Sequence, residues 1–380
     1  MARHGLRILA LEAYYGGSHR AFLDTLVGHS RHEFTVMTLP ARKWKWRMRG
    51  SAIWFAQEIA KRASQAPDLI LTTDMVSVTD LKSLLVGGVR ELPVVCYFHE
   101  NQLTYPLPNE ADRDFQYGFT NITSCLASDA VWFNSRFHLD DFVEGVARLL
   151  RKMPDYVPEG IGDELKRRAT VKYPLVEMDA IRAAATATGR PEQPLRILWN
   201  HRWEYDKNPE AFFEAVIGLA QAGHDFRLVV VGETFRQAPK AFASSWRALR
   251  GKIEQTGYIA SRPDYLAALA GCHVVVSTSI QENFGIAVVE AMVAGCRPLL
   301  PDRLSYPELI PERFHATCLY HDVGELQSRL AELIGAGGGA GIAGLEASVF
   351  ERFSVERNIE TFDRAFEAVL EASPSRYVAP

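Results

Sequence analysis

The chain has 380 residues, of which 47% are hydrophobic and 23% are charged, and its formal net charge is −4. These values are typical of a globular protein and exclude disordered, collagenous and coiled-coil chains. One hydrophobic core rarely organises so many residues, so we expect two domains. The five cysteines are scattered without a Cys-x-x-Cys pair, which argues against a disulfide framework or a structural zinc site and predicts a reducing compartment.

The N-terminal residues 1–17 form a short apolar run that ends in glycines and lacks a small-residue cleavage site, so they predict a first β-strand rather than a signal peptide. No stretch approaches the roughly 20 apolar residues of a membrane helix. We therefore expect a cytoplasmic protein without a membrane anchor. Residues 1–50 carry nine Lys and Arg against three Asp and Glu, a local net charge of +6, which favours an anionic partner.

Short β-branched runs alternate with amphipathic stretches along the whole chain. In the first half the predicted strands are Leu6–Leu11, Phe34–Thr38, Leu69–Thr72, Val94–Phe98 and Ala130–Phe133, separated by predicted helices at Arg20–His29, Ser51–Ser64, Val78–Val86 and Tyr117–Ser128. A second series of strands is predicted at Leu195–Trp199, Arg227–Val231, Lys252–Thr256, His273–Ser277 and Pro298–Leu300. Strands that alternate with helices indicate βαβ units and a parallel sheet, and this pattern occurs twice.

Proline and glycine punctuation without apolar periodicity places a linker within residues 171–193. We predict an N-terminal Rossmann-like domain over residues 1–175 and a second one over 176–355, with a C-terminal helix over 356–380 that crosses back to the first. The fold class is therefore α/β, with two doubly wound domains that face a central cleft. Ligands of such sheets bind at the carboxyl ends of the strands, so residues that directly follow strands are the candidates for function.

Two loops of the first domain carry such candidates. After the first strand, Gly16 and Gly17 permit close approach of a ligand, and Ser18 is expected to cap the next helix, whose N–H groups attract anions. An ordinary tight turn explains the same residues, and the dinucleotide fingerprint Gly-x-Gly-x-x-Gly is absent. After strand Val94–Phe98 come His99, Glu100 and Asn101, where an imidazole can exchange protons with a polar substrate or be a buried structural histidine.

The second domain offers cations and carboxylates after its strands. Arg202 and Lys207 follow strand Leu195–Trp199 and together suit a diphosphate, although a solvated charged loop is the alternative. Glu282 precedes a helix that begins around Asn283–Gly285 and carries Glu290, so the helix N–H groups can hold a phosphate and the carboxylates can accept from sugar hydroxyls. Ordinary capping and compensation of the helix dipole would also place two carboxylates there.

The run Arg42–Arg49 is basic and aromatic. Its cations can neutralise phosphates, and Trp44 or Trp46 can stack on unpaired bases. The alternative is a loop leading into a helix, with both tryptophans packed inward.

The pairing of Arg202 and Lys207 with Glu282-x7-Glu290 resembles the retaining GT-B glycosyltransferases of family 4. The first domain resembles the narrower family of tRNA-queuosine α-mannosyltransferases. This second resemblance is carried by Leu11–His19, Leu39–Arg47, Tyr97–Gln102, Arg113–Gly118, Phe133–Ser135, His201–Glu204 and Val231–Phe235, which occur in the family's order over nearly the full chain.

The resemblance implies a GT-B fold, GDP-mannose as donor and the cyclopentenediol of queuosine in a tRNA anticodon as acceptor. It places Arg202 and Lys207 on the donor diphosphate, Glu290 on the ribose, Glu282 with the amides of Asn283, Phe284 and Gly285 on the mannose, Gly16 and Gly17 on the phosphate side, and His99 near the anomeric carbon. We further expect the acceptor tRNA to contact Ser18, His19, Lys43, Trp44, Lys45, Trp46, Arg47, Glu100 and Asn101.

No Asp-x-Asp pair stands at a strand end, so we expect transfer without a metal or a cofactor, with Arg202, Lys207 and helix N-termini stabilising the departing diphosphate. Two other hypotheses remain. One is a transferase that acts on a lipid or small-molecule acceptor, with the basic run meeting an anionic membrane. The other is a non-catalytic module that binds a nucleotide or RNA on the same fold.

Overall fold

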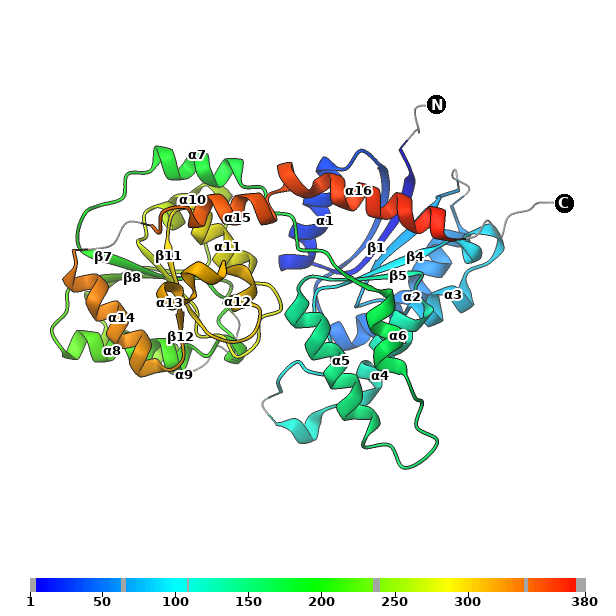
Figure 1. Ribbon diagram of the computed structural model, residues 1–380, viewed down its shortest axis with the longest axis horizontal. Coiled ribbons are helices and arrows are strands. Elements are labelled where there is room, and N and C mark those ends of the chain that lie inside the picture. The colour runs from blue at the N-terminus through cyan, green and yellow to red at the C-terminus, as the bar shows by residue number, and fades with distance from the viewer. Residues whose placement is uncertain (1–4, 63–65, 108, 235–239, 338–340, 374–380) are drawn as a thin grey trace. The chain divides into compact units, whose positions relative to one another are not determined.

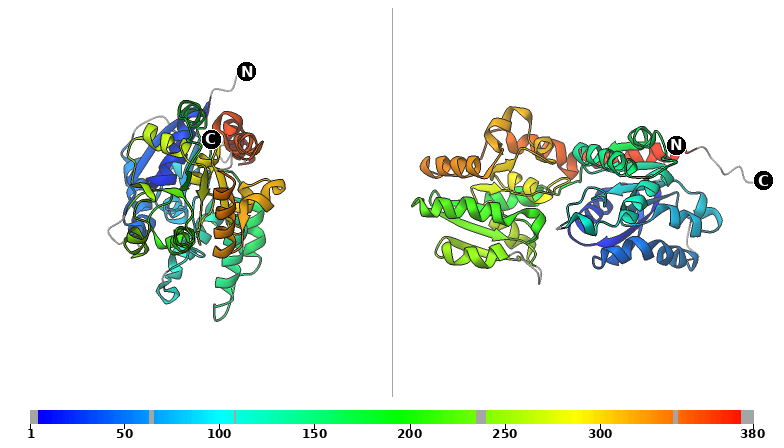
Figure 2. Two further views of the ribbon diagram at one scale, coloured as in Figure 1. Left: turned by 90° about the vertical axis from the view of Figure 1, so that its left-hand side faces the viewer. Right: turned by 90° about the horizontal axis from the view of Figure 1, so that it is seen from below.

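The computed structural model describes residues 5–62, 66–107, 109–234, 240–337 and 341–373. The chain divides into two compact units, Met1–Leu175 with Val355–Pro380 and Val176–Ser354. Each contains a six-stranded parallel sheet covered by helices on both faces (Figures 1 and 2). The prediction of two Rossmann-like parallel-sheet domains is confirmed. Phe235, the last residue of one predicted motif, lies outside the described residues.

The first unit has the strand order β2-β1-β3-β4-β5-β6. Its strands are β1 (Arg7–Tyr15), β2 (Glu33–Pro40), β3 (Leu69–Thr73), β4 (Val94–Phe98), β5 (Ala130–Phe133) and β6 (Ala169–Val171), and its helices are α1 (Gly17–His29), α2 (Trp44–Ala60), α3 (Val78–Leu84), α4 (Phe115–Ala127), α5 (Arg136–Leu150), α6 (Ile161–Arg168) and α16 (Val355–Ala372). The order reverses between β1 and β3, which makes their carboxyl ends the expected place for a ligand.

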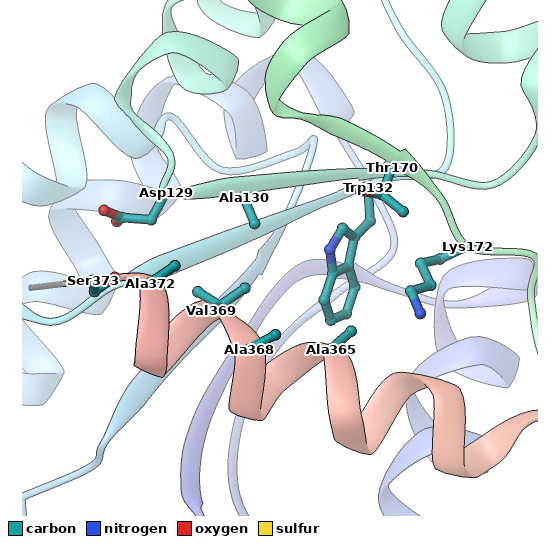
Figure 3. A pocket seen from close by; sticks show the side chains of 10 residues that line it. All are labelled: Asp129, Ala130, Trp132, Thr170, Lys172, Ala365, Ala368, Val369, Ala372 and Ser373. Carbon is teal, nitrogen blue, oxygen red and sulfur yellow. The ribbon is translucent and has the colours of Figure 1, made fainter.

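Alternation along β1 divides the core of this unit. Leu9 and Leu11 pack into the layer of α2 to α6, whereas Ile8 and Ala10 pack into the layer that contains α1 and α16. In that second layer α16 lies against β5 and β6, and Figure 3 shows Trp132 and Lys172 pointing toward it. A groove of about 420 Å³ lies there, lined by residues that include Ala130, Trp132 and Val369. Helix α16 ends at Ala372, and residues 374–380 of the predicted C-terminal helix lie outside the described residues.

The second unit has the strand order β12-β11-β10-β7-β8-β9, and its order reverses between β7 and β10. Its strands are β7 (Leu195–Trp199), β8 (Phe226–Val231), β9 (Ile253–Gly257), β10 (Val274–Val276), β11 (Arg297–Pro301) and β12 (Leu319–Tyr320). Its helices are α7 (Asp179–Ala187), α8 (Pro209–Gln221), α9 (Lys240–Ala248), α10 (Arg262–Ala270), α11 (Ile286–Val293), α12 (Tyr306–Leu309), α13 (His315–Cys318), α14 (Val323–Gly335) and α15 (Leu345–Phe353).

Helices α8, α9 and α14 pack with one face of this sheet, and α7, α10, α11 and α15 lie on the other (Figure 1). All five cysteines are free and buried. Among the described residues, no helix combines the length and the apolar character that a membrane span requires.

Candidate functional site

The turn after β1 positions the first candidates of unit 1. Gly17 has φ +51°, a left-handed conformation that favours glycine, and a Cβ on Gly16 would lie 2.5 Å from the Cβ of Ala41. The N-cap of α1 is Gly16, which makes no side-chain cap hydrogen bond. The prediction that Ser18 caps this helix is therefore wrong, because the helix already begins at Gly17 and Ser18 lies exposed in its first turn.

Glu12, for which the sequence predicted no function, is a buried carboxylate that binds several polar groups at this end of the sheet. Glu12 is only 1% exposed and receives three hydrogen-bond donors. Its Oε1 accepts from the Tyr14 N–H at 2.7 Å and from the Thr73 hydroxyl at 3.1 Å, and its Oε2 lies 3.2 Å from Nδ1 of His19. Burial alone would lower the pKa of His19, but the Glu12 carboxylate outweighs it and raises that pKa to about 9. His19 is thus a buried imidazolium, and its predicted contact with the acceptor stays a prediction.

His99, at the end of β4, lies against this ion pair. Its ring is tilted by 32° to the His19 ring at a centroid distance of 4.0 Å. Its backbone N–H donates to Oδ1 of Asp74 at 2.8 Å, and its carbonyl accepts from Nδ2 of Asn134 at 2.9 Å. Burial, and then the charge of His19, lowers the pKa of His99 well below its ordinary value, so the imidazole is neutral. Burial raises the pKa of the Asp74 carboxyl to about 7.

The two residues after His99 have different surroundings. Glu100 is half-buried, and its Oε1 accepts from Nε2 of Gln102 at 2.9 Å. Asn101 is buried, and its Oδ1 accepts from the N–H groups of Leu103 and Thr104, both at 3.0 Å. The Asn101 side chain therefore closes a local turn.

Glu12, His19 and His99 are also the described residues that bring possible ligand atoms for a metal ion within 4.8 Å of one another. The Oε2 of Glu12 and the Nδ1 of His19 are bound to each other, and the other Glu12 oxygen already has two donors. The geometry is that of a hydrogen-bonded ion pair, and the expectation of a metal-free enzyme stays a prediction.

The basic-aromatic run does not form a loop but the beginning of helix α2, which starts at Trp44. Trp44 is half-buried and packs edge-on against Tyr117, with 5.0 Å between the two ring centres. Nζ of Lys45 lies over the Trp44 ring. Trp46, in contrast, is 64% exposed and lies along the helix over Gly50, where a Cβ would come within 2.8 Å of its ring. Of the two tryptophans, Trp46 is the one presented to solvent.

The remaining cations of this run are also at the surface. Lys43 and Lys45 are exposed, and Lys43 precedes the helix in a left-handed conformation with φ +57°. Nε of Arg47 donates to the carbonyl of Pro40 at 3.2 Å, while the Arg49 guanidinium lies 4.9 Å from the centre of the Tyr117 ring. These side chains and Trp46 form a surface of cations around one exposed indole, which we call the α2 surface (Lys43, Lys45, Trp46, Arg47 and Arg49).

In unit 2, the carboxyl ends of β7 and β10 bring Lys207 and Glu282 together. Nζ of Lys207 donates to the carbonyl of Gln281 at 2.8 Å and lies 3.2 Å from Oε2 of Glu282 and 3.2 Å from Oδ2 of Asp206. Burial would lower the pKa of Lys207, but the two carboxylates raise it, so the lysine stays charged. Arg202 is more exposed. Its Nη1 lies 3.1 Å from Oε2 of Glu204, and its Nη2 lies 3.9 Å from Oδ2 of Asp206. Asp206, for which the sequence predicted no function, thus lies within ion-pair distance of both predicted cations.

Glu290 forms a second charged group on α11. Its Oε1 accepts from Nη2 of Arg262 at 2.6 Å, and its Oε2 accepts from the Tyr265 hydroxyl at 3.1 Å. Asn200 then donates to the same hydroxyl at 3.2 Å and to the carbonyl of Ala287 at 2.8 Å. Glu290, which is predicted to bind the ribose, is therefore oriented by three side chains that the sequence analysis did not identify. These are Asn200 after β7 and Arg262 and Tyr265 on α10.

The residues that lead into α11 are ordered by buried contacts. Gly285 is the N-cap of the helix with φ +102°, and the Ser305 hydroxyl interacts with the carbonyls of Glu282 at 3.1 Å and Phe284 at 3.0 Å. Phe284 packs edge-on against Phe353 at 5.2 Å, and Oδ1 of Asn283 accepts from Nε2 of Gln281 at 3.1 Å. The turn before α11 is therefore held rigidly, which is what a helix N-terminus needs to bind an anion with its N–H groups.

Comparisons with known proteins show which family the chain resembles. Residues 7–176 match the family model described as tRNA-queuosine alpha-mannosyltransferase N-terminal, and residues 181–334 match that of glycosyl transferases group 1. The tRNA-queuosine alpha-mannosyltransferase of Drosophila melanogaster is 35% identical over 314 residues, which are 80% of this chain and 82% of that protein. A GDP-mannose-dependent alpha-(1-6)-phosphatidylinositol dimannoside mannosyltransferase of Mycobacterium tuberculosis is 29% identical over 119 residues, 31% of this chain and 30% of that protein.

Solved structures show the same fold at low identity. The sucrose-phosphate synthase of Thermosynechococcus elongatus has a TM-score of 0.71 at 15% identity, covering 96% of this chain and 100% of that one. Anabaena HepE in complex with UDP and glucose has a TM-score of 0.66 at 14% identity, covering 97% and 100%. The fold is the GT-B fold, and the protein is a glycosyltransferase. Given the family models and the relative that matches over four fifths of both chains, this chain belongs to the tRNA-queuosine alpha-mannosyltransferase family.

Proposed function

We propose that the protein transfers mannose from GDP-mannose, with retention, to the cyclopentenediol of queuosine in the anticodon of a tRNA. The carrying observation is the ion pair between the buried Lys207 and the partly buried Glu282 after β7 and β10, with Arg202 near Asp206, the other partner of Lys207. Two cations that suit a diphosphate beside a carboxylate that suits sugar hydroxyls support a nucleotide-sugar site, and parallel sheets bind ligands where the strand order reverses. Two relatives, a tRNA-queuosine alpha-mannosyltransferase and a GDP-mannose-dependent mannosyltransferase, support the choice of acceptor and of donor.

The reaction balances without any further reactant. The acceptor hydroxyl oxygen bonds to the anomeric carbon as the bond from that carbon to the diphosphate oxygen breaks. The hydroxyl proton passes to the departing phosphate oxygen, and GDP leaves. Lys207 and Arg202 stabilise the negative charge that develops on the diphosphate, which lowers the barrier because the charges are held in place beforehand. Glu282 orients the sugar, and the neutral imidazole of His99 contacts the sugar or the acceptor near the anomeric carbon.

The α2 surface of cations and one exposed indole supports an RNA acceptor. Cations neutralise phosphates, and an exposed aromatic ring stacks on a base that is not paired. The lipid alternative requires a surface that inserts into a bilayer, but residues 42–49, which carry the exposed indole, contain five cationic residues. The charge therefore favours a polyanion with unpaired bases.

The decisive test is incubation with GDP-mannose and tRNA that contains queuosine, followed by mass analysis of the nucleosides. We expect one hexose on queuosine and none on the same tRNA carrying guanosine at that position. The one-bond carbon–hydrogen coupling constant at the anomeric carbon of the isolated nucleoside then reports retention. GDP-glucose and UDP-galactose serve as donor controls. Release of GDP without transfer to the tRNA would keep the donor and discard the acceptor, and no release would contradict both.

A further inference from the structure

The ion pair between Glu12 and His19 is buried more completely than a surface salt bridge. Ionised side chains in a protein interior are costly unless each charge is paired and hydrogen-bonded. Here the cost is offset on the carboxylate by the Tyr14 N–H and the Thr73 hydroxyl in addition to His19. A carboxylate with three donors is held in one orientation, and it therefore holds the His19 ring in one orientation.

The His19 ring, held in this orientation, is one of the rings that pack against His99. The rings lie 4.0 Å apart, and the rings of Tyr97 and Phe22 lie 4.8 and 5.1 Å from that of His99. The His99 backbone is fixed on both sides of the residue by Asp74 and Asn134. His99 is thus fixed by its backbone and oriented by the rings around it, of which His19 alone carries a charge.

Several titratable groups lie around the His19 and His99 rings. Glu12 comes from β1, Asp74 follows β3, Glu100 follows β4, and His138 lies on α5, where its Nδ1 donates to Oδ1 of Asn134 at 2.8 Å. The carboxylates favour a positive charge, and that charge settles on His19 because Glu12 contacts it directly. A second positive charge on His99, 4.0 Å away by ring centre, would be repelled by the first. Burial lowers the pKa of His138 to about 3, so His138 adds no charge.

We propose that Glu12 and His19 are positioning residues for His99, with Glu12 keeping His19 as a cation whose adjacent ring orients His99 and keeps it neutral. A neutral imidazole can both donate and accept a hydrogen bond, whereas a protonated one can only donate. The role of His99 in transfer rests on the proposed function, but the charge states can be measured without any substrate.

The first measurement is nitrogen NMR of the whole protein with labelled histidine, with His19→Asn and His99→Asn used for assignment. At pH 7.5 we expect the wild-type His19 ring to be an imidazolium and the His99 ring to be neutral. In Glu12→Gln we expect the His19 ring to be neutral at the same pH. A neutral His19 in the wild type, or an imidazolium that persists in Glu12→Gln, would overturn the proposal whether or not the protein transfers mannose.

The second measurement separates positioning from simple structural support. We expect Glu12→Gln and His19→Asn to lower kcat by about tenfold to a hundredfold, since misplacing a group near the reaction costs that much, and to alter the pH profile of kcat. Thr73→Val, which removes one of the three donors to Glu12, should lower kcat by a smaller factor. The matched control is His32→Asn, because His32 is also buried and uses both ring nitrogens, on the Leu6 N–H and the Asp363 carbonyl.

The control should lose stability and keep both kcat and its pH profile. If Glu12→Gln and His19→Asn do the same, their role is structural and the proposal fails. The proposal also fails if chelation abolishes wild-type transfer and Zn²⁺ restores it, because Glu12 would then be a metal ligand. A wild type that transfers no mannose contradicts the proposed function instead, and the NMR result still decides the charge states.

Discussion

Nζ of Lys207 lies 3.2 Å from Oε2 of Glu282, so the cation expected to hold the diphosphate and the carboxylate expected to hold the sugar are bound to each other. A diphosphate that approaches Lys207 therefore competes with Glu282 for the same ammonium group. If the diphosphate takes that position, Glu282 is released toward the sugar hydroxyls beside it. The pair would then couple occupation of the phosphate site to preparation of the sugar site.

Glu282→Gln separates these two roles. We expect GDP to bind to this variant as tightly as to the wild type or more tightly, because the carboxylate that competes with the diphosphate for Lys207 is gone. Mannosyl transfer should fall by about a hundredfold or more, the usual effect of losing one preorganised polar contact in the transition state. Calorimetric titration with GDP and steady-state transfer measure the two quantities on the same protein. An undiminished rate would remove Glu282 from the site.

Lys207→Met should instead weaken GDP binding by about thirtyfold or more, because it removes a buried charge and leaves Asp206 and Glu282 uncompensated. The matched control is Lys252→Met. Lys252 is also a lysine of unit 2 in an ion pair, 2.9 Å from Asp225, but it directly precedes β9 at the amino end of the strand. Equal GDP affinities for the two variants would contradict the assignment of Lys207.

Tyr265→Phe tests the residues that orient Glu290. The substitution removes the hydroxyl that donates to Glu290 and accepts from Asn200. One lost hydrogen bond is worth about 0.5–1.5 kcal/mol, so GDP should bind roughly threefold to tenfold more weakly. Binding of inorganic pyrophosphate should not change, since Arg202 and Lys207 are intact. Tyr156→Phe, at a side chain that is 98% exposed in unit 1, is the control, and a parallel loss of pyrophosphate binding would contradict a specific effect on the ribose.

Hydrophobic runs predicted most of the sheet. Strands β4, β5 and β7 have the predicted bounds because each is a short apolar run. The edge strands β6 and β12, of three and two residues, were missed because they are too short to show a period. Helix α2 begins at Trp44 and not at Ser51, since tertiary contacts of Trp44 and the buried Met48 stabilise a basic turn that has no apolar periodicity.

The same distinction applies to the candidate sites. Their place along the chain was predictable, because His99 directly follows β4, and Lys207 and Glu282 lie in the segments that follow β7 and β10. Their partners were not, since a partner is chosen by the fold rather than by spacing in the sequence. Glu290 meets Arg262 from 28 residues away, and Asp74 reaches the backbone of His99 from a neighbouring strand. Glu12 and His19 do lie within one motif, but no local pattern indicates that their side chains meet.

Trp46, which belongs to the α2 surface, and the nearby Trp44, which does not, should respond differently to substitution. Trp46→Ala should weaken binding of the tRNA by about tenfold and leave the melting temperature unchanged, because stacking of one base is worth about 1–3 kcal/mol and the ring is mostly exposed. Trp44→Ala should lower the melting temperature, since it removes the contact with Tyr117. Filter binding and thermal denaturation measure the two effects.

Trp54→Ala is the control for Trp46, because Trp54 is also exposed on α2 but lies outside the basic run. It should leave tRNA binding unchanged. Binding of the wild type to vesicles with anionic lipids, lost in Trp46→Ala while tRNA binding persists, would contradict the RNA assignment and favour a membrane.

The cations of the α2 surface should determine the salt dependence of tRNA binding. Each phosphate contact to single-stranded RNA contributes about 0.7 to the slope of log K against log salt concentration. Replacing Lys43, Lys45 and Arg47 with glutamine should therefore reduce the slope by about two if all three contact phosphates. Replacing Lys61, Arg62 and Arg90, three cations of unit 1 outside this run, is the control. An unchanged slope in the first variant would contradict the surface.

The Glu12–His19 pair also predicts how stability depends on pH. The pKa of His19 is raised from 6.5 to about 9, so its ion pair stabilises the fold fully below pH 6.5 and this contribution is lost as the pH rises to about 9. The pKa of Asp74 is raised from 3.8 to about 7, so its contribution to stability is also lost as the pH rises, but over the range from about pH 3.8 to about pH 7. Above pH 7 the comparison therefore isolates His19. Chemical denaturation at pH 7 and pH 9.5 should show the wild type losing stability and Glu12→Gln losing less, and equal losses would contradict a charged His19.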